Sequence, residues 1–157
     1  MLAFIISIWL AIAASVSATP LDDCLANAGA TLIYPKSSSY ANLTKPAILE
    51  FTYHPHVVVI PSSTLQVARI VKCVSADKGE TTLTVASGGH NYVGYAFIGD
   101  VVIRSDKMTD IAIDDVKKQV TVQFGQKLGT MAKAIGKKGY ALPHGMYSTA
   151  YDMIRPY

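Results

Sequence analysis

The chain has 157 residues, which is the length of one domain or of part of a larger one. Half of the residues are hydrophobic and only 16% are charged, which excludes a highly charged disordered chain. The formal net charge is only +3 and no long run of Lys and Arg occurs, so nothing indicates a nucleic-acid partner.

The first 18 residues are uncharged and apolar apart from three serines, and they end in Val16-Ser17-Ala18. The apolar core is too short to cross a bilayer of about 30 Å as a lone anchor. We therefore expect a signal peptide over residues 1–18, cleaved near Ala18, and a secreted, extracellular protein without a stable membrane anchor. The basic residues that usually open a signal peptide are missing, so an N-terminal membrane anchor is the alternative.

Secretion decides how the two cysteines, Cys24 and Cys73, are interpreted. In an oxidising compartment an even pair is most simply a disulfide, and closing this loop stabilises the fold by roughly 4 kcal/mol at most. Neither cysteine has a neighbour at metal-ligand spacing, so we expect no metal site. Asn42-Leu43-Thr44 is a sequon and predicts N-glycosylation of Asn42 on a surface loop.

The first half of the chain predicts two helices around a buried strand. Thr19-Pro20 can cap a helix that Gly29 ends, and residues 37–42 form a polar loop. The β-branched run Val57–Ile60 is typical of a buried strand. A capping box beginning at Ser63 then opens a helix that Gly79 closes, and the next strand covers residues 82–85. This order predicts a right-handed parallel βαβ unit, with Cys73 on its helix.

The second half predicts further strands and one helix. A glycine-rich loop covers residues 87–99, and a strand follows at Val101–Ile103. Residues 111–115 indicate a short strand and turn, and Val120, Val122 and Phe124 alternate in another strand. An amphipathic helix runs from Gln126, with Lys137 and Lys138 in its last turn. We expect an α+β fold with a βαβ unit and small mixed sheets.

The loop Ser87-Gly88-Gly89-His90-Asn91-Tyr92 leaves the second strand directly. Adjacent glycines allow positive φ, and consecutive N–H groups in such a turn can bind a pyrophosphate. A neutral imidazole held beside that ligand is a nucleophile near neutral pH. The alternative is an ordinary Gly-Gly turn followed by a hydrogen-bonded surface histidine.

The order of motifs around this loop resembles one family. The motifs are the strand ending in Pro61, the sequence SGGH at 87–90, NYVGY at 91–95, VVI at 101–103, VQFGQKLG at 122–129 and ALPHG at 141–145. Together they resemble the secreted FAD-linked oxidoreductases of the berberine-bridge-enzyme type, including fungal oligosaccharide oxidases. Their flavin-binding part is a PCMH-type, vanillyl-alcohol-oxidase-like domain, and the match runs from Leu21 to Gly145.

The resemblance implies a role for each matching residue. His90 stands where the family attaches the 8α-methyl group of FAD covalently. Its neighbours stand in the loop around the pyrophosphate and flavin, and these are Ser87, Gly88, Gly89, Asn91 and Tyr92. Gly145 stands where a second FAD loop begins, and Cys24 and Cys73 match the family's N-terminal disulfide. The partners expected are FAD and, in a full-length form, a small alcohol or sugar substrate.

Several positions depart from the family pattern. Ala86 stands where Arg is usual, Arg104 where many members have Asp, and Tyr147 where many have a second flavin-linking Cys. The pattern stops at Gly145, so we expect a partial FAD-binding domain over residues 19–145 and an aberrant tail over 146–157. A tail translated from an unspliced intron would explain the break, because Gly-Met-Tyr can be encoded across a GTATGT splice donor.

Two functions therefore remain. The first is an FAD-dependent oxidoreductase, here truncated before its substrate domain and inactive alone. The alternative is a secreted non-enzymatic fragment, or the product of a wrongly spliced transcript, that binds no flavin. Of the other histidines, His54 and His56 indicate a solvated strand entrance more than a metal pair, and His144 fits either a flavin contact or an ordinary loop.

Overall fold

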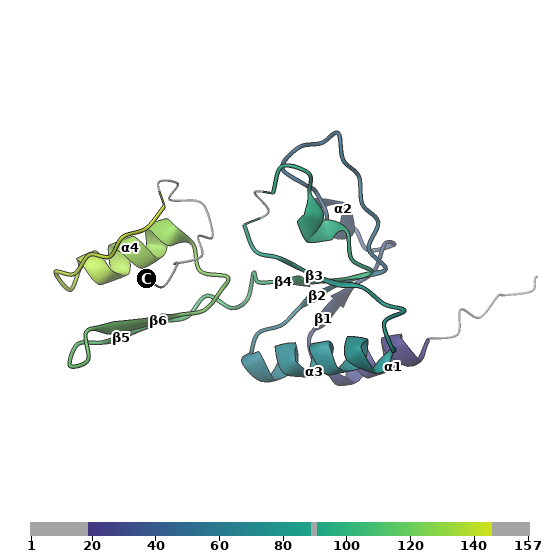
Figure 1. The fold of residues 1–157 in the computed structure, drawn as a ribbon, viewed down its shortest axis with the longest axis horizontal. Coiled ribbons are helices and arrows are strands. Elements are labelled where there is room, and N and C mark those ends of the chain that lie inside the picture. The colour runs from purple at the N-terminus through teal and green to yellow at the C-terminus, as the bar shows by residue number, and fades with distance from the viewer. Residues whose placement is uncertain (1–18, 89–90, 146–157) are drawn as a thin grey trace, which may run out of the picture.

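The computed structural model describes residues 19–88 and 91–145 (Figure 1). The predicted signal peptide, Gly89, His90 and the predicted tail from Met146 onward lie outside the described residues. Among the described residues, no helix is long and apolar enough to cross a membrane.

The described chain alternates short strands and helices. In order, the elements are α1 (Pro20–Asn27), β1 (Thr31–Ile33), α2 (Tyr40–Leu43), β2 (Val57–Ile60), α3 (Thr64–Ala76), β3 (Leu83–Ala86), the 3-10 turn η1 (Tyr95–Phe97), β4 (Val101–Arg104), β5 (Ile111–Asp114), β6 (Gln119–Val122) and α4 (Leu128–Gly136).

Four strands form a mixed sheet in the order β1-β2-β4-β3. Strands β2 and β3 both run parallel to β4, and β1 runs antiparallel to β2. The predicted parallel βαβ unit is confirmed as β2-α3-β3, although β4 lies between its two strands. Strands β5 and β6 form a separate antiparallel pair that lies with α4 beside the main sheet (Figure 1). The chain is therefore α+β, as the sequence predicts.

Strand β2 is buried on both faces of the sheet, as its unbroken β-branched run predicts. Alternate side chains of β2 point to opposite sides. Val57 and Val59 pack with α1 and α3, whereas Val58 and Ile60 pack with Tyr40 of α2 and with η1. Figure 1 shows the same two layers, with α1 and α3 on one face and α2 and η1 on the other.

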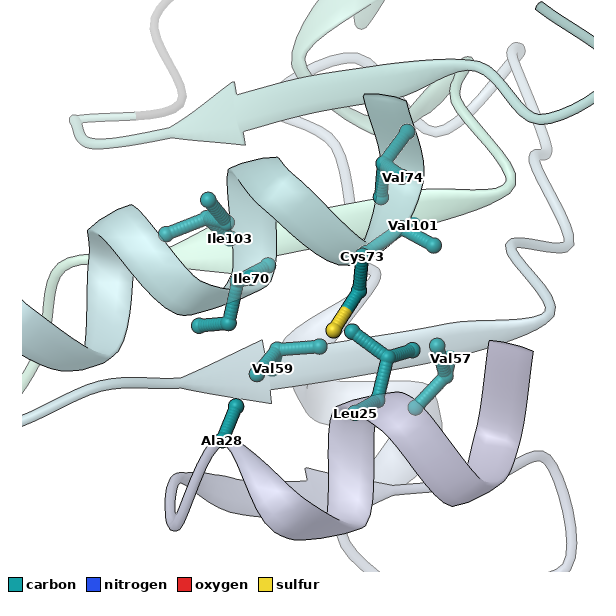
Figure 2. Close-up of a cluster of buried hydrophobic side chains, with 9 residues drawn as sticks. All are labelled: Leu25, Ala28, Val57, Val59, Ile70, Cys73, Val74, Val101 and Ile103. Atoms are coloured by element: carbon teal, nitrogen blue, oxygen red, sulfur yellow. The ribbon is translucent and has the colours of Figure 1, made fainter. Parts of the chain in front are cut away.

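The predicted disulfide forms between Cys24 and Cys73, whose Cα atoms are 5.7 Å apart. It joins α1 to α3 on one face of the sheet. Figure 2 shows Cys73 pointing toward Leu25 and Val59, within the cluster of buried apolar side chains. The cross-link therefore holds both helices of this layer against the central strands.

The start of α1 is fixed by one carboxylate, Asp22. It accepts hydrogen bonds from the Thr19 hydroxyl (2.8 Å) and from Tyr34 Oη (2.9 Å), and its Oδ1 lies 2.8 Å from His56 Nε2. Burial alone would raise the pKa of Asp22, but the hydrogen bonds from His56, Thr19 and Tyr34 prevail and lower the pKa to about 2. Burial and the neighbouring carboxylate raise the pKa of Tyr34 to about 12. Asp22 thus ties α1 to β1 and to the entrance of β2.

Three local predictions need correction. The polar loop at 37–42 contains the helical turn α2, because Tyr40 is buried and its hydroxyl donates to the Pro55 carbonyl (2.5 Å). The capping box of α3 is half formed: Ser63 accepts from the Gln66 N–H, but the Gln66 side chain accepts from the Ser62 N–H instead. Helix α4 ends at Gly136, before Lys137 and Lys138.

Removing the disulfide should destabilise the fold. In Cys24→Ser and Cys73→Ser we expect the free energy of unfolding to fall by about 2–4 kcal/mol, because the unfolded chain gains the freedom of a long open loop. Denaturant titration of the full chain measures this. The Cys24→Ser, Cys73→Ser double variant should cost no more than either single variant, and clearly additive losses would contradict a shared cross-link.

Acid should remove the contribution of Asp22. A carboxylate whose pKa falls from 3.8 to about 2 on folding stabilises the protein above pH 4 and loses this effect as the pH drops toward 2. Asp22→Asn should therefore flatten the acid dependence of the unfolding temperature and cost about 1–2 kcal/mol near neutral pH. Asp23→Asn, an exposed neighbour in the same turn, is the control, and equal acid profiles for the two variants would contradict the assignment.

Candidate functional site

The parallel strands bring three chain segments to one edge of the main sheet. Ile60 ends β2, Ala86 ends β3 and Arg104 ends β4, and the last two are direct register partners. In open α/β sheets, ligands bind at the carboxyl ends of parallel strands, where successive connections diverge. Here α3, which follows β2, covers one face, while η1, which lies between β3 and β4, covers the other (Figure 1).

The predicted glycine loop begins at this edge. Ser87 and Gly88 are partly buried directly after β3, whereas Asn91 and Tyr92 are exposed, Tyr92 with 79% of its surface accessible. The Asn91 side-chain oxygen accepts from the Val93 N–H (3.0 Å) and more weakly from the N–H of Tyr95. This side chain therefore shapes the return of the loop, and its oxygen is already engaged by the protein.

The elements β5, β6 and α4 form a second lobe beside the main sheet, and its backbone approaches the glycine loop (Figure 1). The Ser87 hydroxyl donates to the Phe124 carbonyl, just after β6, at 3.1 Å. The next residue, Gly125, donates its N–H to the Met108 carbonyl at 2.9 Å. A Cβ atom on Gly125 would lie only 1.9 Å from the Ser105 carbonyl oxygen, so no other residue fits without a backbone shift. Glycine at 125 thus allows the two lobes to meet beside the loop.

Ser105 is the first residue after β4, and no sequence motif points to it. Its N–H lies 3.4 Å from the Ala86 carbonyl, which places it beside the start of the glycine loop. The side chain is buried, with 1% of the residue exposed, and its hydroxyl has no hydrogen-bond partner among the described residues. Buried hydroxyls are nearly always bonded, so this one is a polar group without its partner. Its position after a buried strand, at the end where ligands bind, is the signal that could have identified it.

The charge at Arg104 is balanced within the same segment. The guanidinium donates to both carboxylate oxygens of Asp106 (2.6 and 2.8 Å) and to the Leu43 carbonyl (2.8 Å). The hydrogen bond from Arg104 lowers the pKa of Asp106 against the opposing effect of burial. Arg104 faces Ala86 across the two strands, so the two departures from the family pattern stand side by side.

The remaining candidates lie elsewhere. His56 binds Asp22 at the entrance of β2, at the opposite end of that strand from the glycine loop. His144 donates from Nδ1 to the adjacent Gly145 carbonyl (2.7 Å), and both residues follow α4 in the second lobe. Asn42 is exposed on α2. Within residues 19–88 and 91–145, no group of three or more His, Cys, Asp and Glu could hold a metal ion.

The chain matches a known protein family over the segment that forms this edge of the sheet. A family model described as an FAD binding domain matches residues 55–152, which is more than half of the chain. The matched segment contains β2, α3, the glycine loop, Ser105 and Gly125.

Several of the similar proteins are named as oxidases of carbohydrates. The chain is 28% identical to a carbohydrate oxidase of Microdochium nivale over 91% of its own length, and 33% identical to a glucooligosaccharide oxidase of Sarocladium strictum over 62%. A solved structure of a glucooligosaccharide oxidase from Acremonium strictum, with a 6-S-cysteinyl, 8α-N1-histidyl FAD, matches 81% of the chain with a TM-score of 0.72 and 28% identity. The chain spans only 30%, 20% and 27% of these three proteins, respectively.

Gly125 and Gly136 provide a matched pair of substitutions. Gly125→Ala should destabilise the chain by roughly 1–3 kcal/mol, because the added methyl group meets the backbone of Ser105 and Met108. Gly136→Ala meets no atom within 4 Å at the end of α4 and should stabilise the chain by up to about 1 kcal/mol. Thermal unfolding of both variants measures the difference, and equal unfolding temperatures would contradict the close approach.

Proposed function

The chain belongs to the FAD-binding domain family, and we propose that it is the N-terminal flavin-binding part of a secreted oxidoreductase that oxidises an alcohol or sugar carbon. The observation that carries this proposal is the glycine loop at the carboxyl edge of the parallel strands, inside the segment that the family model matches. The uncharged apolar segment at residues 1–18 and the Cys24–Cys73 disulfide support secretion.

The residues at this edge fit a dinucleotide of this kind. Gly88 carries no side chain to obstruct a ligand, and consecutive N–H groups of a glycine turn suit a diphosphate. The buried Ser105 hydroxyl lacks a partner among the described residues, and Tyr92, at the end of the loop, is an exposed aromatic ring. In the proposed assignment Ser87, Gly88, Gly89, Asn91 and Tyr92 hold the diphosphate and flavin, and Gly145 begins a second contact from the other lobe.

His90 is the proposed site of covalent attachment. It follows the two glycines directly, and its imidazole nitrogen would form a bond to the flavin methyl carbon while the imidazole N–H and one methyl C–H each give up a proton. The flavin ring would take up the two electrons and would then be reoxidised by O₂. The histidyl FAD of the Acremonium strictum oxidase supports a linkage of this kind. Tyr147 stands where a linking cysteine would be needed for a second bond, so we propose attachment through the histidine alone.

When bound, FAD supplies the acceptor for a hydride from the substrate, and the protein supplies placement and electrostatics. None of the described residues is assigned a contact with the substrate. The chain spans less than a third of the relatives reported above, so we propose that substrate binding and turnover require protein beyond this segment.

One observation favours the alternative of a fragment that binds no flavin. Strand β3 is at the end of the sheet order, and Val85 on it has 51% of its surface exposed. An open strand edge with an exposed apolar side chain promotes aggregation, which would remove the flavin site. Size-exclusion chromatography of the secreted chain separates this alternative from a folded flavoprotein.

The attachment is tested by making the full chain in a secretory host and measuring flavin absorbance after denaturing precipitation. We expect wild-type protein to stay yellow and His90→Ala to release its colour, because only a covalent bond survives denaturation. His54→Ala, an exposed histidine before β2, is the control and should stay yellow. A soluble wild-type protein without retained flavin would contradict the proposed attachment.

A further inference from the structure

We propose that the Ser105 hydroxyl donates a hydrogen bond to a diphosphate oxygen of FAD. This inference rests on the proposed function, and it assigns a role to a residue outside the glycine loop. It begins from the one buried side-chain polar atom without a hydrogen-bond partner among the described residues. A buried hydroxyl without a partner has lost its hydrogen bonds to water and has gained none to the protein. This is unfavourable unless a bound ligand supplies the missing hydrogen bond.

The position of Ser105 selects the diphosphate among the parts of FAD. Its N–H approaches the carbonyl of Ala86, the last residue of β3, and Ser87, the first residue of the glycine loop, follows directly. Its own carbonyl is covered by Gly125. Ser105 therefore lies where the glycine loop begins and the second lobe meets it. The N–H groups of such a glycine turn suit a diphosphate.

Two other serine hydroxyls at this edge of the sheet are already engaged. The proton of the Ser87 hydroxyl is directed at the Phe124 carbonyl. Ser62, after β2, donates its hydroxyl to the Gln66 side chain. Ser105 has a proton with no acceptor among the described residues, and a phosphate oxygen is a strong acceptor.

The surrounding charges favour an anion. Arg104 precedes Ser105, and Lys127 is close enough to Asp106 to lower the pKa of that carboxyl further. Lys127 is also the N-cap of α4, which has no side-chain cap, so the partial positive charge of this helix end lies two residues beyond Gly125. The Asp106 carboxylate is already bonded to Arg104, and Lys127 adds a second positive charge near that pair.

Removal of the hydroxyl should therefore have opposite effects with and without the cofactor. In Ser105→Ala, the unfolding temperature of the flavin-free chain should stay the same or rise, because an unsatisfied polar group is lost. The affinity for FAD should fall about 10- to 100-fold, as expected for the loss of one hydrogen bond to a charged group. A serine with a purely structural role would show the reverse pattern, a lower unfolding temperature with unchanged affinity.

The experiment measures reversible binding to the full chain in the His90→Ala background, where no covalent bond can form. FAD and riboflavin, which lacks the diphosphate, are titrated into three proteins while flavin fluorescence is followed. The proteins are the background itself, the background with Ser105→Ala, and the background with Ser62→Ala as the control. We expect Ser105→Ala alone to weaken FAD, with riboflavin affinity unchanged in all three.

Each other result overturns the inference in a distinct way. Equal FAD affinity for the Ser105→Ala and Ser62→Ala proteins would show that Ser105 makes no contact with the cofactor. Parallel losses for FAD and riboflavin would place the contact at the flavin rather than at the diphosphate. Absence of FAD binding by both the background protein and the wild-type chain would overturn the proposed function itself, and this inference with it.

Discussion

The carboxyl edge of the main sheet depends on the close approach of two backbones at Gly125. This residue follows β6, and it lies against the segment that follows β4 so closely that a side-chain carbon would meet the Ser105 carbonyl at 1.9 Å. The bond from the Ser87 hydroxyl to Phe124 joins the glycine loop to the same point. The loop, the start of α4 and the buried Ser105 therefore take their relative positions from one contact between the lobes.

The position of that edge also depends on the strands of the main sheet, and the layer formed by α1 and α3 holds these strands in place. The disulfide between Cys24 and Cys73 holds α1 and α3 over the face of the sheet that contains Val57 and Val59. Asp22 anchors the first turn of α1 to the residue before β2 through His56. The strand ends that present the candidate site are thus supported by a cross-linked layer that makes none of the proposed cofactor contacts.

Much of the fold could be predicted from local sequence patterns. The run Val57–Ile60 and the capping residue Ser63 identify β2 and α3, because burial and capping act within a few residues. The position of β4 between β2 and β3 could not be predicted in this way, since strand order depends on pairings between distant segments. The orphaned hydroxyl of Ser105 and the pairing of Arg104 with Asp106 likewise exist only after the chain is folded. The motif located the loop, while the structure identified the residues that surround it.

The central claim is that this edge holds FAD and that His90 carries it. The most direct test is mass spectrometry of the peptide containing residue 90, prepared by proteolysis of the full chain secreted from a host that supplies FAD. The account predicts a peptide heavier by one FAD, with fragment ions that locate the modification on the histidine. A soluble, disulfide-bonded chain that yields only the unmodified peptide would contradict it.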